Sequence, residues 1–161
     1  MKRRGARLCG SLALAALTAC GSTAPPPPVP ARSFDDPGFV ASDDHELRYG
    51  TVLSADLEAA VAAAYGIDRR RDEVVVNLSV LRRRPGQLPE SVAATVWGTW
   101  HAPAGEPAEL RFQAVTAGDA VSYVATAPVR DREPIVLELQ ALPAAGGAPL
   151  LARITRQFEL R

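Results

Sequence analysis

The stretch Val74-Val75-Val76-Asn77-Leu78-Ser79-Val80-Leu81 carries the clearest structural signal in this 161-residue chain. Apolar residues occupy every second position, namely Val74, Val76, Leu78 and Val80. Asn77 and Ser79 lie between them on the opposite side. Because successive side chains of a strand point to opposite faces of a sheet, this alternation predicts an antiparallel strand with one buried and one wet face.

The same two-residue period recurs along the chain after residue 45. It predicts further strands over residues 47–53, 92–100, 110–115, 121–127, 135–141 and 150–160, which makes about seven in all. Arg156 interrupts the apolar face of the last strand. Gly118 and Asp119 fall between two of the strands, where they favour the positive φ of a hairpin turn.

One segment departs from the strand period. Leu57, Val61 and Tyr65 have the spacing of a helix face, Ser54 precedes them as a candidate N-cap, and Gly66 follows as a candidate C-cap. A short helix is therefore expected between the first two strands. One helix cannot supply the crossovers of a parallel sheet, so the pattern predicts an all-β fold, an immunoglobulin-like antiparallel β-sandwich.

The N-terminus has the pattern of a lipoprotein signal. Lys2, Arg3 and Arg4 precede an apolar run over residues 8–19, which is too short to span a bilayer, and Cys20 follows it directly. We expect residues 1–19 to be a cleaved signal peptide and Cys20 to carry the lipid (diacylglycerol and palmitate). The alternative is an ordinary signal peptide in which the cysteine is incidental.

Residues 20–44 are expected to form the lipid anchor and a Pro-rich tether, and residues 45–161 the β-sandwich domain. Four consecutive prolines at 25–28 favour an extended polyproline II spacer of about 3.1 Å per residue. Such a run is also a possible ligand for proline-reading domains. The domain would face the periplasm, and Gly21 favours the outer over the inner membrane because it is not the aspartate that retains some lipoproteins at the inner one.

Composition narrows the classes of partner. The chain has 18 basic and 18 acidic residues, and four of the basic ones lie in the signal, so the mature chain carries a net charge of −4. This charge argues against nucleic acid as a partner. Cys9 leaves with the signal and Cys20 is expected to be acylated, so no disulfide is expected and the domain must rely on its own core.

The region from His45 to Leu160 resembles domain of unknown function family 4426, a family of small exported proteobacterial proteins. The residues that carry the resemblance are Tyr49, Leu57, Tyr65-Gly66-Ile67, Arg69, Val76-Asn77-Leu78, Gly98, Phe112, Gly118-Asp119-Ala120 and Tyr123. The chain departs from the family pattern at Arg48, Arg70 and Ala114. The resemblance implies an exported sandwich domain and brings no established activity.

Familiar catalytic and metal-binding patterns are weak here. Asp43-Asp44-His45-Glu46 has suitable metal ligands, but neighbours in an extended chain point to alternate sides, so we expect a solvated strand start and no metal site. The mature chain has no Gly-x-Ser-x-Gly motif, no Gly-rich phosphate loop and no free cysteine. We therefore expect neither a cofactor nor an enzyme.

The binding residues favoured by the sequence are Tyr49, Tyr65, Arg69 and Asn77. A tyrosine, an arginine and an asparagine can bind a carboxylate, although such groups more often hydrogen-bond irregular backbone where a helix returns to a sheet. The chain is thus expected to be a lipid-anchored, periplasm-facing binding or scaffolding module with a possible envelope protein partner. The alternative is an envelope enzyme with a pocket at these four residues.

Overall fold

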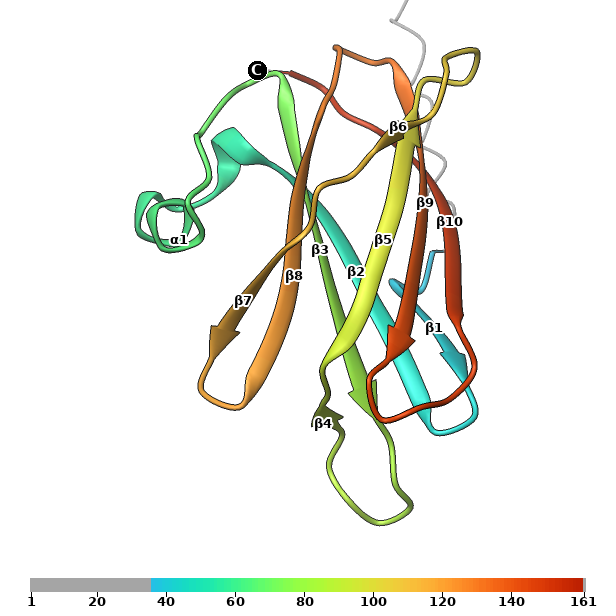
Figure 1. Cartoon of the computed structure of the whole chain (residues 1–161). Coiled ribbons are helices and arrows are strands. Elements are labelled where there is room, and N and C mark those ends of the chain that lie inside the picture. Colours follow the sequence, from blue (N-terminus) through green and yellow to red (C-terminus); the bar gives the residue numbers. More distant parts are fainter. Residues whose placement is uncertain (1–35, 161) are drawn as a thin grey trace, which may run out of the picture. The chain divides into compact units, whose positions relative to one another are not determined.

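The computed structural model describes residues 36–160 and shows a β-sandwich of two antiparallel sheets (Figure 1). A six-stranded sheet has the order β1-β2-β3-β8-β7 with β4 paired to β3, and a four-stranded sheet has the order β10-β9-β5-β6. The elements are β1 (Phe39–Ser42), β2 (His45–Leu53), a 3-10 turn η1 (Ser54–Asp56), α1 (Ala59–Tyr65), β3 (Glu73–Arg82), β4 (Glu90–Ser91), β5 (Ala94–His101), β6 (Ala108–Glu109), β7 (Gln113–Ala117), β8 (Ala120–Pro128), β9 (Pro134–Pro143) and β10 (Leu150–Gln157). The expected all-β sandwich is confirmed, with ten strands in place of about seven.

β3 is the central strand that the sequence predicted. It pairs with β2 on one side and β8 on the other, and Val74, Val76, Leu78 and Val80 are fully buried. These side chains pack in one core with inward residues of the four-stranded sheet, including Leu137 and Leu139 on β9. Burial of the two apolar faces against each other is the main contribution to the stability of such a fold.

The outer face of β3 is covered at one end only. Val75 and Val124 are buried there beneath Leu57, Tyr65 and Ile67, which belong to the crossover that contains α1. This cover explains why three consecutive valines follow Glu73 at the start of the strand. The next outward residue, Asn77, lies beyond the cover and is exposed.

Ser54, at the start of the crossover, has a role different from the helix N-cap that the sequence predicted. Ser54 does not cap the helix; it is fully buried, and its hydroxyl donates to Arg70 O at 2.8 Å and accepts from Arg70 N at 2.9 Å. α1 begins only after Glu58, without a side-chain cap. Ser54 thus joins the two ends of the crossover. Gly66 ends the helix with φ +64° in the left-handed conformation, as predicted.

Two strand assignments changed. β1 lies within residues 20–44, assigned to the tether, and pairs with β2 through a two-residue turn, so the sheet begins before residue 45. The strand expected over 110–115 is replaced by β6 and β7, because the chain passes from the four-stranded to the six-stranded sheet between them. Leu110 is buried in that passage, and its N–H donates to Gly98 O at 2.9 Å. Within residues 36–160, no helix is long and apolar enough to cross a lipid bilayer.

Candidate functional site

The four residues favoured by the sequence do not form one site. Tyr49 and Asn77 line a shallow depression of about 520 Å³ on the six-stranded sheet, together with Arg48 and Ser79. Tyr65 packs apart from this depression, over the covered end of the outer face of the sheet, in the cluster around Val75 and Val124. The structure therefore brings together two of the four.

Arg69 holds the backbone of the crossover. Its guanidinium donates to the carbonyl oxygen of Ala55 at 2.6 Å, in the 3-10 turn before α1. Together with the Ser54–Arg70 bonds, this contact closes the crossover over residues 54–70. It is a contact to irregular backbone, the structural alternative raised by the sequence.

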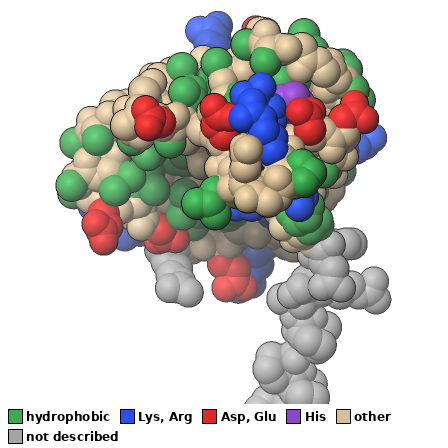
Figure 2. All heavy atoms as spheres, turned by 90° about the horizontal axis from the view of Figure 1, so that it is seen from below, with side chains coloured by type: hydrophobic (Ala, Val, Ile, Leu, Met, Phe, Trp, Pro, Cys, Tyr) green, Lys and Arg blue, Asp and Glu red, His purple; other side chains and the backbone are tan. Residues whose placement is uncertain are grey.

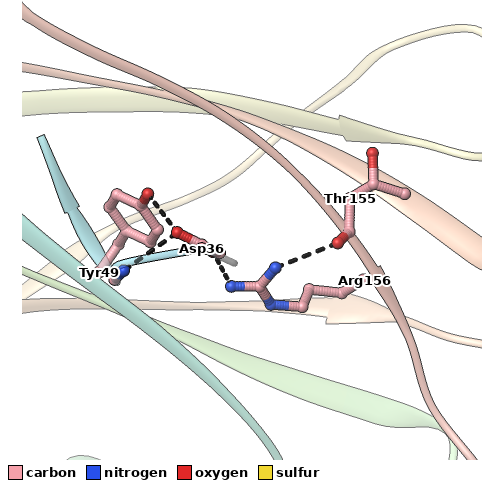
Figure 3. A network of polar contacts seen from close by, with 5 residues as sticks. Asp36, Tyr49, Thr155 and Arg156 are labelled. Carbon is pink, nitrogen blue, oxygen red and sulfur yellow. Dashed lines mark hydrogen bonds and ion pairs between the residues drawn. The ribbon is translucent and has the colours of Figure 1, made fainter. Parts of the chain in front are cut away.

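Tyr49 takes part in a polar network that joins the two sheets (Figure 3). Its hydroxyl donates to Asp36 Oδ1 at 2.6 Å, and the other oxygen of Asp36 forms an ion pair with the guanidinium of Arg156. The N–H of Gly38 donates to Asp36 Oδ1 at 3.0 Å. Tyr49 lies on β2 and Arg156 on β10, so the segment before β1 is fixed to both sheets.

The ionisation of this network follows from its contacts. Burial alone would raise the pKa of Asp36, but hydrogen bonds from Tyr49 and Gly38 and the charge of Arg156 outweigh it and lower the pKa below 3.8. Burial and the hydrogen bond to the Asp36 carboxylate raise the pKa of Tyr49 from 10.0 to about 12. The network therefore contains a carboxylate and a neutral phenol over a wide pH range.

The sequence contained a partial signal for this network. Arg156 interrupts an apolar strand face, and such an inward charge requires a partner. The partner, Asp36, lies 120 residues away in the chain, so no local pattern connects the two.

The end of the sandwich that carries the β1–β2 turn is rich in paired charges. Viewed from that end, arginine and acidic side chains lie side by side (Figure 2). Glu46 is 4% exposed and accepts from Arg48 Nε at 2.6 Å and from Arg83 at 3.2 Å. A hydrogen bond from Arg82 lowers the pKa of Glu90. These contacts make the cluster a set of local ion pairs.

The expected solvated strand start is wrong for His45 and Glu46. Both are buried, because β1 pairs with β2 along this segment and places it inside the sheet. The Nδ1 atom of His45 lies 2.8 Å from Asp44 Oδ1. No group of three or more His, Cys, Asp or Glu side chains in residues 36–160 is placed to hold a metal ion.

The β5–β6 and β8–β9 loops and the C-terminal segment meet at the opposite end of the sandwich (Figure 1). Residues from these segments line a cavity of about 570 Å³. We call it the end pocket. Its apolar lining consists of Trp100, Ala102, Pro128, Val129, Ile135 and Leu160. Its charged and polar lining consists of Asp72, His101, Glu106, Arg130, Asp131 and Glu133.

Hydrogen bonds hold the walls of the end pocket in place. Asp131 Oδ1 accepts from Leu160 N at 2.9 Å, and Arg132 N donates to Phe158 O at 2.8 Å, which joins the β8–β9 loop to the C-terminal segment. Val129 N donates to Asp72 O at 2.9 Å. The pocket is thus formed by ordered backbone and is not a gap between loose loops.

The two tryptophans of β5 lie on opposite faces of the strand, as expected for residues three positions apart. Trp100 packs against the core and lines the end pocket, whereas Trp97 is 40% exposed on the other face of the strand. The sequence did not identify the end pocket, because its lining comes from four separate regions of the chain between residues 72 and 160. The only signal was that one of the two tryptophans had to face inward.

The comparisons agree with this architecture. The family model described as "Domain of unknown function (DUF4426)" matches residues 40–158. The crystal structure of a DUF4426 family protein from Pseudomonas aeruginosa PAO1 is similar, with a TM-score of 0.63 and 22% identity over 76% of this chain and 94% of that chain. No curated protein matches the chain. The family match covers well over half of the sequence, so the chain belongs to the DUF4426 family, which confirms the resemblance seen in the sequence.

Proposed function

We propose that this DUF4426 protein is a lipid-anchored binding module of a bacterial cell envelope, with the end pocket as its ligand site. The sandwich would face the periplasm, held by Cys20 and the Pro-rich tether, with the outer membrane favoured. The observation that carries the proposal is the end pocket itself, about 570 Å³ with an apolar lining and a few charged groups. Ligand sites are typically concave, mostly apolar and provided with a small number of polar groups.

The residue types in the end pocket support binding over covalent catalysis. Its lining in the described part of the chain includes no serine, threonine, cysteine or lysine, the types that most often act as covalent nucleophiles. His101 is its one imidazole, and His101 Nδ1 lies 2.8 Å from Ala102 O. Since a carbonyl oxygen only accepts, Nδ1 carries the hydrogen, and this ring nitrogen is not directed at a catalytic partner.

The sequence supports the envelope location. The basic start of the chain, the short apolar run and Cys20 at its end follow the order of a lipoprotein signal, and the prolines that follow suit a spacer between a lipid and a domain. The enzyme alternative required Tyr49, Tyr65, Arg69 and Asn77 in one pocket. Their separation in the structure removes the geometric support for that alternative.

The test compares how much envelope ligand is retained by the wild-type protein, whose end pocket is open, and by a variant in which a larger side chain fills the pocket. Full-length protein would be solubilised from a Gram-negative host in nonionic detergent, and native mass spectrometry would detect co-purifying small molecules and peptides. Ala102 lines the pocket and Ala104 lies in the same loop outside it, so Ala102→Phe fills the pocket and Ala104→Phe is the matched control. We expect a ligand to be retained by wild type and Ala104→Phe and lost from Ala102→Phe. Equal retention by all three proteins would contradict the proposal.

A further inference from the structure

We infer that the ligand of the end pocket is a small organic cation, an ammonium or guanidinium group attached to an apolar body. This inference rests on the proposed binding role of the pocket and assigns the chemical class of its ligand. It is drawn from the balance of charge around the pocket, the exposure of the ion pair at its rim, and the apolar surface inside it.

The rim of the end pocket is rich in hydrogen-bond acceptors. Four carboxylates line it, from Asp72, Glu106, Asp131 and Glu133, against one cation, Arg130. A ligand that brings donors and positive charge matches this rim, whereas an anion would meet an excess of negative charge.

Glu133 is the carboxylate best placed to hold such a ligand. Its side chain is 35% exposed, and its ion-pair partner Arg130 is 85% exposed at a distance of 3.5 Å. An ion pair to so exposed an arginine is strongly screened by water and contributes little. A ligand cation held against the apolar lining is less screened, so it competes well with Arg130 for the Glu133 carboxylate.

Asp131 and Asp72 also form contacts with other residues around the end pocket. Asp131 uses Oδ1 to accept the N–H of Leu160, and Asp72 lies 3.4 Å from the guanidinium of Arg70. Their charges still contribute to the negative potential at the pocket. Within the described residues the Glu133 carboxylate forms no hydrogen bond or ion pair except that with Arg130, so Glu133 is the residue to change in a test.

The apolar lining determines the other half of the ligand. Val129 and Ile135 belong to the buried core, with 4% and 2% of their surface exposed, and Trp100 and Leu160 pack against the same core. When a compact hydrocarbon group binds on this surface, its apolar surface is removed from contact with water, which favours binding. The combination of such an apolar lining with an acidic rim selects against fully polar cations as well as against anions.

The experiment uses three probes of nearly the same shape: cyclohexylmethylammonium, cyclohexylmethanol and cyclohexanecarboxylate. Each is titrated into the full chain in nonionic detergent, carrying Trp97→Phe so that Trp100 is the one tryptophan fluorophore. We expect the ammonium to change Trp100 emission at a concentration at least tenfold lower than the alcohol, and the carboxylate to bind more weakly than either. The Ala102→Phe variant should abolish the response to all three probes.

Two glutamine variants locate the charge. Glu133→Gln should weaken ammonium binding at least fivefold and leave the alcohol unchanged, while Glu138→Gln, on the outer face of β9 and paired with Arg153, should change neither. Equal binding of ammonium and alcohol, or tighter binding of the carboxylate, would overturn the inference about the ligand class and leave the binding role of the pocket intact. An ammonium response that Ala102→Phe does not remove would place the cation elsewhere and overturn the inference as well.

Discussion

Changing Tyr49 to phenylalanine removes one hydroxyl group, and with it the 2.6 Å hydrogen bond to Asp36. The Asp36 side chain is 12% exposed, so the lost donor is not fully replaced by water. Hydrogen bonds to charged groups contribute about 1.5–3 kcal/mol. We expect Tyr49→Phe to lower the free energy of unfolding by about 2 kcal/mol near neutral pH.

The raised pKa of Tyr49 makes this stabilisation depend on pH. Burial of the phenol is the largest cause of the rise in its pKa from 10.0 to about 12, and the hydrogen bond to the Asp36 carboxylate is the next. Because the folded-state pKa lies above the unfolded one, this stabilisation is complete below about pH 10 and is lost as the pH rises through about 12.

The assay is urea unfolding of purified wild-type and variant proteins, followed by circular dichroism, from about pH 8 to about pH 12. The difference in unfolding free energy between wild type and Tyr49→Phe should be about 2 kcal/mol at the lower pH and should shrink toward zero at the upper. Tyr65→Phe is the control, because the contact of Tyr65 with Gln113 uses its backbone oxygen, and its hydroxyl makes no hydrogen bond within residues 36–160.

A double-mutant cycle with Asp36→Asn separates the contribution of the Tyr49–Asp36 hydrogen bond from other effects of the substitutions on stability. Tyr49 and Asp36 are in direct contact, so a coupling of about 1–2 kcal/mol is expected between the two changes. The pKa of Asp36 is lower in the folded than in the unfolded protein, so its ionised carboxylate stabilises the fold above the unfolded pKa, and this stabilisation is lost as the pH falls. Asp36→Asn alone should therefore reduce the loss of stability that the wild type shows below about pH 4. Additive effects, together with a difference that does not shrink at high pH, would refute the reasoning.

Three other changes test the anchor, the core and the crossover. Cys20→Ala should abolish incorporation of labelled palmitate and leave uncleaved or unanchored protein; membrane partitioning after normal cleavage would contradict a lipid anchor. Leu137→Ala, at a fully buried position, should cost about 3 kcal/mol in urea unfolding, whereas Leu142→Ala, at an exposed position of the same strand, should cost less than about 1 kcal/mol. Arg69→Ala should cost about 1 kcal/mol through its contact with Ala55, and a higher melting temperature for this variant would indicate a ligand role.

Periodicity was sufficient to predict the layers of the fold. The alternation over residues 74–81 assigned the inward face of β3 correctly, because a side-chain period of two directly encodes which residues share a face. It did not predict burial of Val75, which depends on where the α1 crossover lies. Ser54 was misassigned for a similar reason, since a serine before a helical pattern suits a cap and also suits the buried hydrogen bonds to Arg70 that it makes.

The candidate sites were less accessible from the sequence. The Asp36–Tyr49–Arg156 network and the end pocket each depend on which loops and strand ends meet across the two sheets. Local sequence patterns do not predict which distant segments meet. Periodicity predicted the sandwich, the resemblance to a family agreed with it, and side-chain chemistry at positions of the family motif suggested Tyr49, Tyr65, Arg69 and Asn77. Their separation in the structure shows that residues shared in a sequence motif need not share a pocket.

The binding role of the end pocket is tested most directly by the two tryptophan indole N–H signals of the protein. Trp100 lines the pocket and Trp97 lies on the outer face of the same strand, so one spectrum reports both surfaces. Nitrogen-15-labelled full-length protein would be titrated with the small-molecule and peptide fraction of its host envelope, with Trp100→Phe used to assign the signals. We expect a saturable shift of the Trp100 signal with the Trp97 signal unchanged. A shift of Trp97 alone, or no shift of either signal, would contradict the account.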